Sequence, residues 1–158
     1  MLSEQAKKEI QKIRDEVPDP QSALLPALYL AQREYGGWLP EQALDEVAAV
    51  MGLPAAQVAG MASFYTMLNK QPVGRHLVQV CTNITCSLLG AQRLVEVVGR
   101  KLGIGVGETT PDGKFTLLEV ECLGSCGTAP AMQVDDRYYE NLTEETIGRV
   151  LDSLRRGS

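Results

Sequence analysis

The sequence predicts an α+β protein, with a small helical bundle over residues 1–74 followed by an α/β domain with a mixed four-stranded sheet over residues 75–158. In the first half, apolar side chains recur at helical spacing and prolines stand at the starts of helices. In the second half, strand-like runs alternate with two helix-like segments. A chain of 158 residues with 44% hydrophobic and 22% charged residues is long enough to bury a core without metal staples.

Two helices open the predicted bundle. Ser3 can cap the first, which an apolar line through Ile10 and Ile13 identifies, and Pro18 ends it. The second covers residues 21–35 and stops at the glycine pair that follows. Both helices therefore have a sequence signal at each end.

Two further helices begin at Leu-Pro pairs that contain Pro40 and Pro54. Short helices joined by tight turns also occur in helix-turn-helix DNA-binding proteins. However, no Lys or Arg lies between Arg33 and Lys70, and the whole chain carries a net charge of −5. Since phosphate contacts supply most of the affinity for DNA, we expect no nucleic-acid partner.

Three aromatic residues in the bundle are candidates for either core or interface. Phe64 and Tyr65 are adjacent, and aromatic side chains often anchor protein interfaces. We expect burial in the bundle core to be the commoner outcome, with one of the pair facing the second domain or a partner. Trp38 follows two glycines and is expected to belong to the core.

The second half is predicted to follow the order strand, helix, strand, strand, strand, helix. A Pro-Asp-Gly turn precedes the second strand, and Asp135-Asp136 turns a hairpin. Thr143 caps the last helix, but Thr146 is not the acid that would complete a capping box. The predicted strands are 76–81, 115–122, 131–134 and 137–139, and the predicted helices are 87–102 and 143–155.

The only four cysteines fall as two close pairs. Cys81 and Cys86 enclose four residues, Cys122 and Cys126 enclose three, and 35 residues separate the pairs. Four thiols in two loops suit two disulfides, a tetrahedral zinc site or an iron-sulfur cluster. No cleavable signal peptide is visible at the start of the sequence, so we expect a cytoplasmic, reducing location and no structural disulfides.

The spacing within the pairs favours an iron-sulfur cluster over zinc. Zinc ribbons and thioredoxin-type redox pairs place two residues between their cysteines, which neither pair does. A wider loop suits ligands that surround a two-iron cluster, although the plant-type ferredoxin spacing is also absent. The hypothesis is therefore a [2Fe–2S] cluster on Cys81, Cys86, Cys122 and Cys126, with a zinc-binding structural module as the alternative.

Local sequence around the cysteines supports a site for an anionic cluster. Cys81 and Cys122 each end a predicted strand, and Cys86 opens a predicted helix, where free amide groups and the helix dipole favour thiolates. Small residues such as Gly124 and Gly127 let backbone amides approach sulfur. Such hydrogen bonds tune the potential of a cluster.

No other constellation in the sequence points to catalysis. His76 is the only histidine and a Rieske centre needs two, so we interpret it as structural. The glycines at 103–107 follow a helix, which is the wrong context for a dinucleotide fingerprint. We therefore expect no catalytic residues. No apolar run approaches the roughly 20 residues that span a bilayer, so direct membrane insertion is not expected.

Several segments together resemble a known family. Cys81-x4-Cys86, residues 110–115, and the run Cys122-Leu-Gly-Ser-Cys126-Gly-Thr-Ala-Pro130 resemble the thioredoxin-like 2Fe-2S ferredoxin subunit of NADH:quinone oxidoreductase, respiratory complex I. Residues 60–65, Gly-Met-Ala-Ser-Phe-Tyr, also match that family. The resemblance implies a thioredoxin-like form of the α/β domain, and it leaves the isomer of the peptide bond before Pro130 undecided.

The resemblance also implies a function and partners. In that family the subunit sits on the subunit that carries FMN and binds NADH, among further iron-sulfur subunits, and its cluster exchanges single electrons with the flavin. The complex would place the chain at the periphery of the inner membrane. Related subunits in soluble NAD-linked hydrogenases and formate dehydrogenases are an alternative that the sequence does not separate from the respiratory type.

Overall fold

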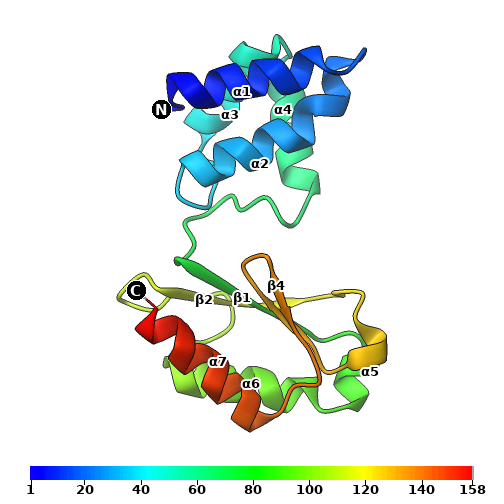
Figure 1. Ribbon diagram of the computed structural model, residues 1–158, viewed down its shortest axis with the longest axis vertical. Coiled ribbons are helices and arrows are strands. Elements are labelled where there is room, and N and C mark those ends of the chain that lie inside the picture. Colours follow the sequence, from blue (N-terminus) through cyan, green and yellow to red (C-terminus); the bar gives the residue numbers. More distant parts are fainter. Residues whose placement is uncertain (158) are drawn as a thin grey trace. The chain divides into compact units, whose positions relative to one another are not determined.

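The computed structural model describes residues 1–157, and its contacts divide the chain into two compact units (Figure 1). The first is Met1–Pro72 and the second begins at Val73. The predicted boundary lies two residues later, between residues 74 and 75. In the part of the chain described here, no helix has both the length and the apolar character needed to span a membrane.

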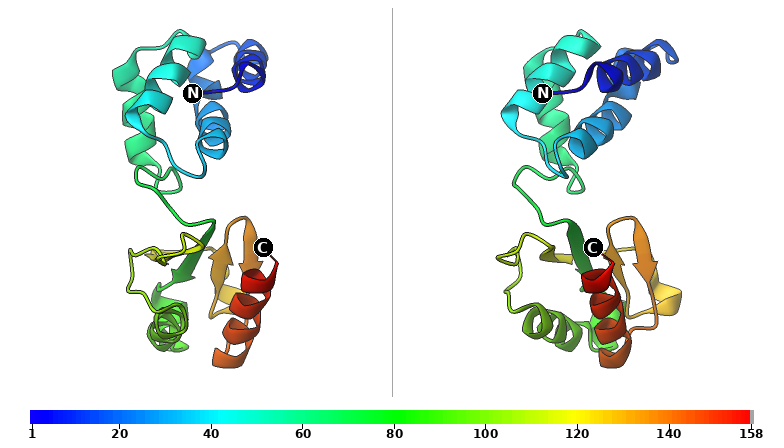
Figure 2. Two further views of the ribbon diagram at one scale, coloured as in Figure 1. Left: turned by 90° about the vertical axis from the view of Figure 1, so that its left-hand side faces the viewer. Right: turned by 60° about the vertical axis from the view of Figure 1, so that its left-hand side comes forward.

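The first unit is a bundle of four α-helices around one core (Figures 1 and 2). Fully buried side chains from all four helices make up this core, among them Ile10, Leu28, Met51 and Val58. Pro40 and Pro54 are the N-cap residues of the third and fourth helices, so their missing amides cost no hydrogen bond. The helices are α1 Glu4–Asp15, α2 Leu24–Glu34, α3 Glu41–Met51 and α4 Ala55–Phe64.

The predicted single helix over residues 21–35 is wrong at its start. A 3₁₀ turn, Pro20–Ala23, precedes α2, which begins only at Leu24. Pro26 gives the reason, because a proline inside an α-helix clashes with the carbonyl four residues earlier. With α2 starting at Leu24, Pro26 falls in the first turn, where an amide has no partner within the helix.

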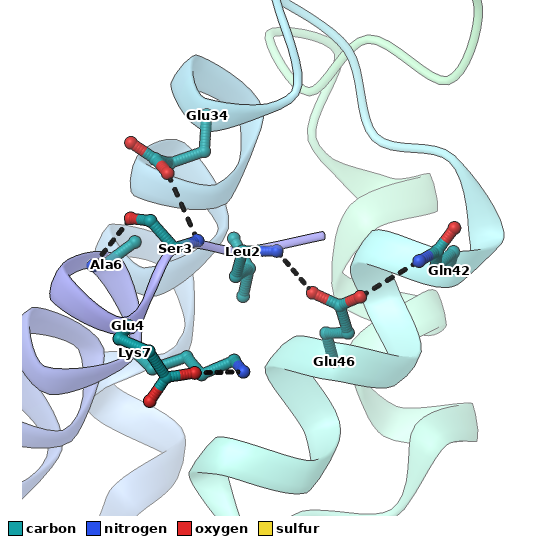
Figure 3. Close-up of polar contacts among 8 residues, drawn as sticks. All are labelled: Leu2, Ser3, Glu4, Ala6, Lys7, Glu34, Gln42 and Glu46. Carbon is teal, nitrogen blue, oxygen red and sulfur yellow. Dashed lines mark hydrogen bonds and ion pairs between the residues drawn. The ribbon is translucent and has the colours of Figure 1, made fainter.

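A carboxylate on α3 holds the start of the chain against the bundle (Figure 3). The Leu2 backbone N–H donates to Glu46 Oε2 at 2.6 Å, and Gln42 Nε2 donates to Glu46 Oε1 at 3.0 Å. The Leu2 amide is the main reason that the pKa of Glu46 lies below its ordinary value. This contact holds Leu2 in place, and the Leu2 side chain is buried in the bundle core.

The second unit contains the predicted mixed four-stranded sheet, with strand order β2-β1-β3-β4. β1 and β2 are parallel, whereas β3 is antiparallel to both β1 and β4. Alternate strand residues join α6 and α7 in one core, so both helices pack on the same face (Figures 1 and 2). The elements are β1 His76–Cys81, α5 Ile84–Leu88, α6 Ala91–Leu102, β2 Phe115–Val120, β3 Met132–Val134, β4 Arg137–Tyr139 and α7 Glu144–Arg156.

Two details of the predicted helices in this unit need correction. The helix predicted over residues 87–102 is two helices, α5 and α6, because Gly90 between them adopts a left-handed φ of 87°. The last helix does have a capping box, in which the Thr146 hydroxyl accepts from the Thr143 N–H at 2.8 Å. A threonine hydroxyl thus replaces the expected acid.

Candidate metal centre

The sheet topology brings the two cysteine pairs to one edge. Because β1 and β2 are parallel, their carboxyl ends meet at the same edge, where Cys81 pairs with Val120 and Cys122 follows two residues later. β3 begins beside the end of β1, with Met132 opposite Val80, so the segment that contains Cys126 returns to this edge. The short helix α5 carries Cys86 there as well (Figure 1).

The first pair is buried and the second is exposed. Cys81 and Cys86 retain 3% and 2% of their accessible surface, and Leu123 and Ala129 from the second loop pack against them. Cys122 and Cys126 are exposed, and all four thiols are free. The site therefore has one side sealed by protein and one side at the surface.

Hydrogen bonds at Cys81 favour its thiolate. Burial raises the pKa of this thiol, but donation from the backbone amides of Asn83 and Leu123, and from the Cys86 and Cys122 thiols, outweighs burial and lowers the pKa overall. These interactions show that sulfurs from both pairs lie within reach of one another. The two loops thus form one thiol cluster.

Cys86 differs from the expectation that a helix N-terminus would favour its thiolate. It is the third residue of the five-residue α5, and burial is the largest influence, so its pKa is raised. The Ala131 amide donates to its sulfur and opposes this shift, while the charges of Cys81 and Cys126 add to it. The amide donor therefore comes from the residue between the second loop and β3.

The second pair receives a local donor. The Gly124 backbone N–H donates to Cys122 Sγ at 3.3 Å. Gly124 has a φ of 72°, in the left-handed region that favours glycine. The expected role of Gly124 in bringing an amide to sulfur is thus present at this position.

The chemistry of the donor set fits an iron-sulfur cluster. Among residues 1–157, no three or more His, Cys, Asp or Glu side chains are arranged to hold one metal ion. A tetrahedral zinc needs all its ligands about one point, whereas each iron of a [2Fe–2S] cluster takes only two thiolates. Four thiols in two loops supply two thiolates for each iron, and backbone amides are directed at the sulfurs.

Sequence reasoning missed the contacts that hold the second cysteine loop, residues 122–130. The Ser125 and Thr128 hydroxyls both donate to Glu140, which follows β4, and the Tyr138 hydroxyl donates to the Leu123 carbonyl at 3.1 Å. The predicted hairpin contained the signal. In the hairpin of β3 and β4, Met132 pairs with Tyr139. Extending this pairing by one residue brings Glu140 opposite Ala131, the residue that follows the loop.

The other residues weighed in the sequence lie outside the thiol cluster. His76 begins β1, at the opposite end from Cys81, and its Nδ1 lies 2.8 Å from Asp135 Oδ2. Tyr65 packs partly against the bundle core, whereas Phe64 is 77% exposed, and Trp38 is half-buried. The peptide bond between Ala129 and Pro130 is cis.

The family model described as thioredoxin-like [2Fe-2S] ferredoxin matches residues 10–155, nearly the whole chain. The chain belongs to this family. That result confirms the resemblance drawn from the cysteine segments and the thioredoxin-like fold. In this thioredoxin-like ferredoxin, the matched region covers both the helical bundle and the unit that carries the cysteines.

Curated relatives of the ferredoxin are components of NADH dehydrogenases. It is 46% identical over 134 residues to a subunit of the NADH-quinone oxidoreductase of Rickettsia conorii, covering 85% of this chain and 80% of the relative. It is 48% identical over 135 residues to the mitochondrial NADH dehydrogenase [ubiquinone] flavoprotein 2 of Dictyostelium discoideum, covering 85% of this chain and 55% of the relative.

A solved structure shares the fold. A chain in the crystal structure of an air-oxidised NAD+-reducing [NiFe]-hydrogenase superposes with a TM-score of 0.72 and 24% identity. The match covers 85% of this ferredoxin and 23% of the hydrogenase chain. At this identity the likeness concerns the fold alone.

Proposed function

We propose that this chain is an electron-transfer subunit of an NADH:quinone oxidoreductase and carries one [2Fe–2S] cluster on Cys81, Cys86, Cys122 and Cys126. The cluster would exchange single electrons with the FMN of a partner subunit that binds NADH. The observation that carries the proposal is the gathering of four free thiols at one sheet edge, two buried and two exposed. The family and the named relatives support it.

A bound cluster would supply outer-sphere, one-electron chemistry, and this chain's residues would set its surroundings. The buried thiols exclude water from one side, and the amides of Asn83, Leu123 and Ala131 stabilise negative charge on sulfur. All four protein ligands are thiolates, so no coordination position is left for a substrate. Electrons would pass through the exposed side at Cys122 and Cys126.

An exposed apolar surface beside the thiols supports a docked subunit rather than a freely diffusing carrier. Ile84, Leu88 and Leu89, in and directly after α5, are 75%, 82% and 56% exposed. Large apolar side chains gathered on a surface mark interaction sites. We assign this α5 surface to contact with the flavin-bearing subunit, which would place the chain in the cytoplasm and at the membrane periphery through its complex.

Co-purification from the source cells tests the host complex. Tagged wild-type chain should bring down an FMN- and NADH-binding subunit together with further iron-sulfur subunits, and NADH should reduce its cluster within that complex. Recovery of hydrogenase or formate dehydrogenase subunits instead would select the alternative host. Recovery of the chain with no flavoprotein at all would contradict the proposal.

A surface variant tests the α5 contact. Leu88→Asp places a charge in the proposed interface and should reduce recovery of the flavoprotein about tenfold or more. Val106→Asp is the matched control, because Val106 is also exposed, at 48%, but lies in the loop after α6. Equal recovery by both variants would remove the α5 surface from the proposal.

A further inference from the structure

The second cysteine loop is held in place by β4 and the segment that follows it. The Asn141 N–H donates to the Thr128 carbonyl at 2.7 Å, and the Leu142 N–H donates to the Pro130 carbonyl at 3.0 Å. The Tyr138 hydroxyl holds the Leu123 carbonyl at 3.1 Å. These three bonds fix the backbone of the loop without any contribution from the Glu140 side chain.

Glu140 acts on the side chains that flank Cys126. Its Oε1 accepts from the hydroxyl of Ser125, one residue before Cys126, and from the hydroxyl of Thr128, two residues after it. The two hydroxyl oxygens lie 2.8 Å apart. Hydrogen bonds from the Ser125 hydroxyl, and to a smaller extent from the Thr128 hydroxyl, hold the pKa of Glu140 below its ordinary value. The side chain is therefore anionic at neutral pH.

A carboxylate with two hydroxyl partners determines where the hydroxyl hydrogens point. An ionised carboxylate only accepts hydrogen bonds, and each hydroxyl has a single hydrogen. Each hydroxyl also lies near a second oxygen, since the two hydroxyl oxygens are 2.8 Å apart and Thr128 Oγ1 is 3.4 Å from the Ser125 carbonyl oxygen. While the two hydroxyls donate to Glu140, their hydrogens are not available to a cysteine or cluster sulfur. Donation to sulfur would stabilise the extra electron of a reduced cluster, so withholding it lowers the reduction potential.

We infer that Glu140 is a positioning residue that turns the Ser125 and Thr128 hydroxyls away from the cluster and so keeps the reduction potential low. The inference rests on the proposed cluster. The negative charge of Glu140 also lowers the reduction potential, because an anion near the cluster opposes reduction. Glu140→Gln keeps the shape of the side chain but removes the charge and weakens its hold on the hydroxyls.

An EPR-monitored redox titration of the full chain tests this inference. In Glu140→Gln we expect the ratio of reduced to oxidised cluster at fixed ambient potential to rise about threefold to tenfold, and tenfold corresponds to about 59 mV for one electron. In a Ser125→Ala/Thr128→Ala background, the same substitution should give a smaller rise, because only the charge effect is left. An unchanged potential, or an equal rise in both backgrounds, would overturn the inference.

Asp136→Asn is the matched control for net charge. Asp136 lies in the turn between β3 and β4, at the opposite end of the hairpin from Glu140, and its loss should leave the potential unchanged. A shift as large as that of Glu140→Gln would show an effect of net charge alone. Absence of a [2Fe–2S] signal in the wild type would count against the proposed function, whereas a normal wild-type signal with an unchanged variant counts only against the role of Glu140.

Cluster loading gives a second readout if Glu140→Gln retains little cluster. Poor loading with an unchanged thermal midpoint of the cluster-free protein would show that Glu140 is needed to form the cluster site rather than to set its potential, and would overturn the inference. Poor loading together with a lowered midpoint of the cluster-free protein would show a general contribution to folding and would overturn the inference.

Discussion

Each of the four cysteines has its own surroundings although all four lie at one sheet edge. Cys81 and Cys86 are almost fully buried, while Cys122 and Cys126 are exposed. Burial on one side protects a cluster from water, and exposure on the other gives electrons a way in.

Removal of one exposed cysteine tests whether the four thiols are the cluster ligands. Cys126→Ala leaves one iron with a single protein thiolate, so we expect loss of most of the cluster and of its visible absorption. Ser125→Ala is the matched control, because it alters the neighbouring residue without removing a thiol, and it should retain the cluster. A full [2Fe–2S] spectrum in Cys126→Ala would show that this thiol is not a ligand.

The Glu46 contact predicts a pH-dependent stability. The folded pKa of Glu46 lies below its ordinary value of 4.5, chiefly because of the Leu2 amide, so its contribution to stability is present above that value and is lost as the pH falls. Glu46→Gln should lower the free energy of unfolding by about 1 kcal/mol or less at pH 7 after allowance for solvent screening. The difference from the wild type should fade below about pH 4.5.

Thermal unfolding followed by circular dichroism between pH 3 and 7 measures this effect. Asp45→Asn is the control, since it removes the neighbouring carboxylate of α3, whose side chain is exposed. A destabilisation of Glu46→Gln that stays constant with pH would contradict the role of its charge.

The residues that could be predicted are those with a local signal. Paired cysteines, a strand that ends at Cys81, another that ends shortly before Cys122, and a glycine beside sulfur are all visible within a few positions of one another. The amides of Leu123 and Ala131 that reach the sulfurs of the first pair are not, because Leu123 lies in the second cysteine loop and Ala131 directly after it. Only the strand register brings them there.

Among the elements, the predicted strand over 115–122 is too long, because β2 ends at Val120 and Cys122 lies in the loop after it. The predicted helices differ from the structure where a special residue divides them. Gly90 separates α5 from α6, and Pro26 delays the start of α2. Apolar spacing does not show where either helix begins or breaks, so it does not reveal these boundaries by itself. The local backbone requirement of glycine or proline prevails over that pattern.

Two helix-interior glycines should respond in opposite ways to alanine. A Cβ at Gly99 in α6 would lie 2.9 Å from the Ile104 carbonyl oxygen, so Gly99→Ala should destabilise by about 1–3 kcal/mol. A Cβ at Gly148 in α7 would meet only the flexible end of Lys101, at 3.1 Å. Gly148→Ala should therefore stabilise by up to about 1 kcal/mol through helix propensity.

Urea unfolding of the two alanine variants side by side checks this pair of predictions, with each serving as the control for the other. Stabilisation by Gly99→Ala would show that the loop after α6 moves at little cost to make room for the added methyl group. Clear destabilisation by Gly148→Ala would show that α7 packs more tightly against Lys101 than the structure indicates.

At the scale of the whole molecule, the chain consists of two units joined near Pro72. Residues 70–72 are exposed and lie outside helices and strands. Because exposed, irregular segments are the preferred sites of proteolysis, limited trypsin should cut first after Lys70. Gel electrophoresis and mass spectrometry should then show two resistant fragments.

A Lys70→Gln variant serves as the control for this cut. The fragment that ends at Lys70 should disappear, and the next cleavage should move to Arg75, which is also exposed. Early cuts within α1–α4 or within the second unit would contradict the division of the chain into two compact parts.

We propose a single [2Fe–2S] cluster in this chain, and metal analysis together with EPR can establish or exclude it. Chain purified without oxygen should contain about two irons and two acid-labile sulfides, and dithionite reduction should give one spin-half signal at low temperature. Zinc in place of iron, or a colourless protein with four free thiols even after reconstitution with iron and sulfide, would contradict the claim.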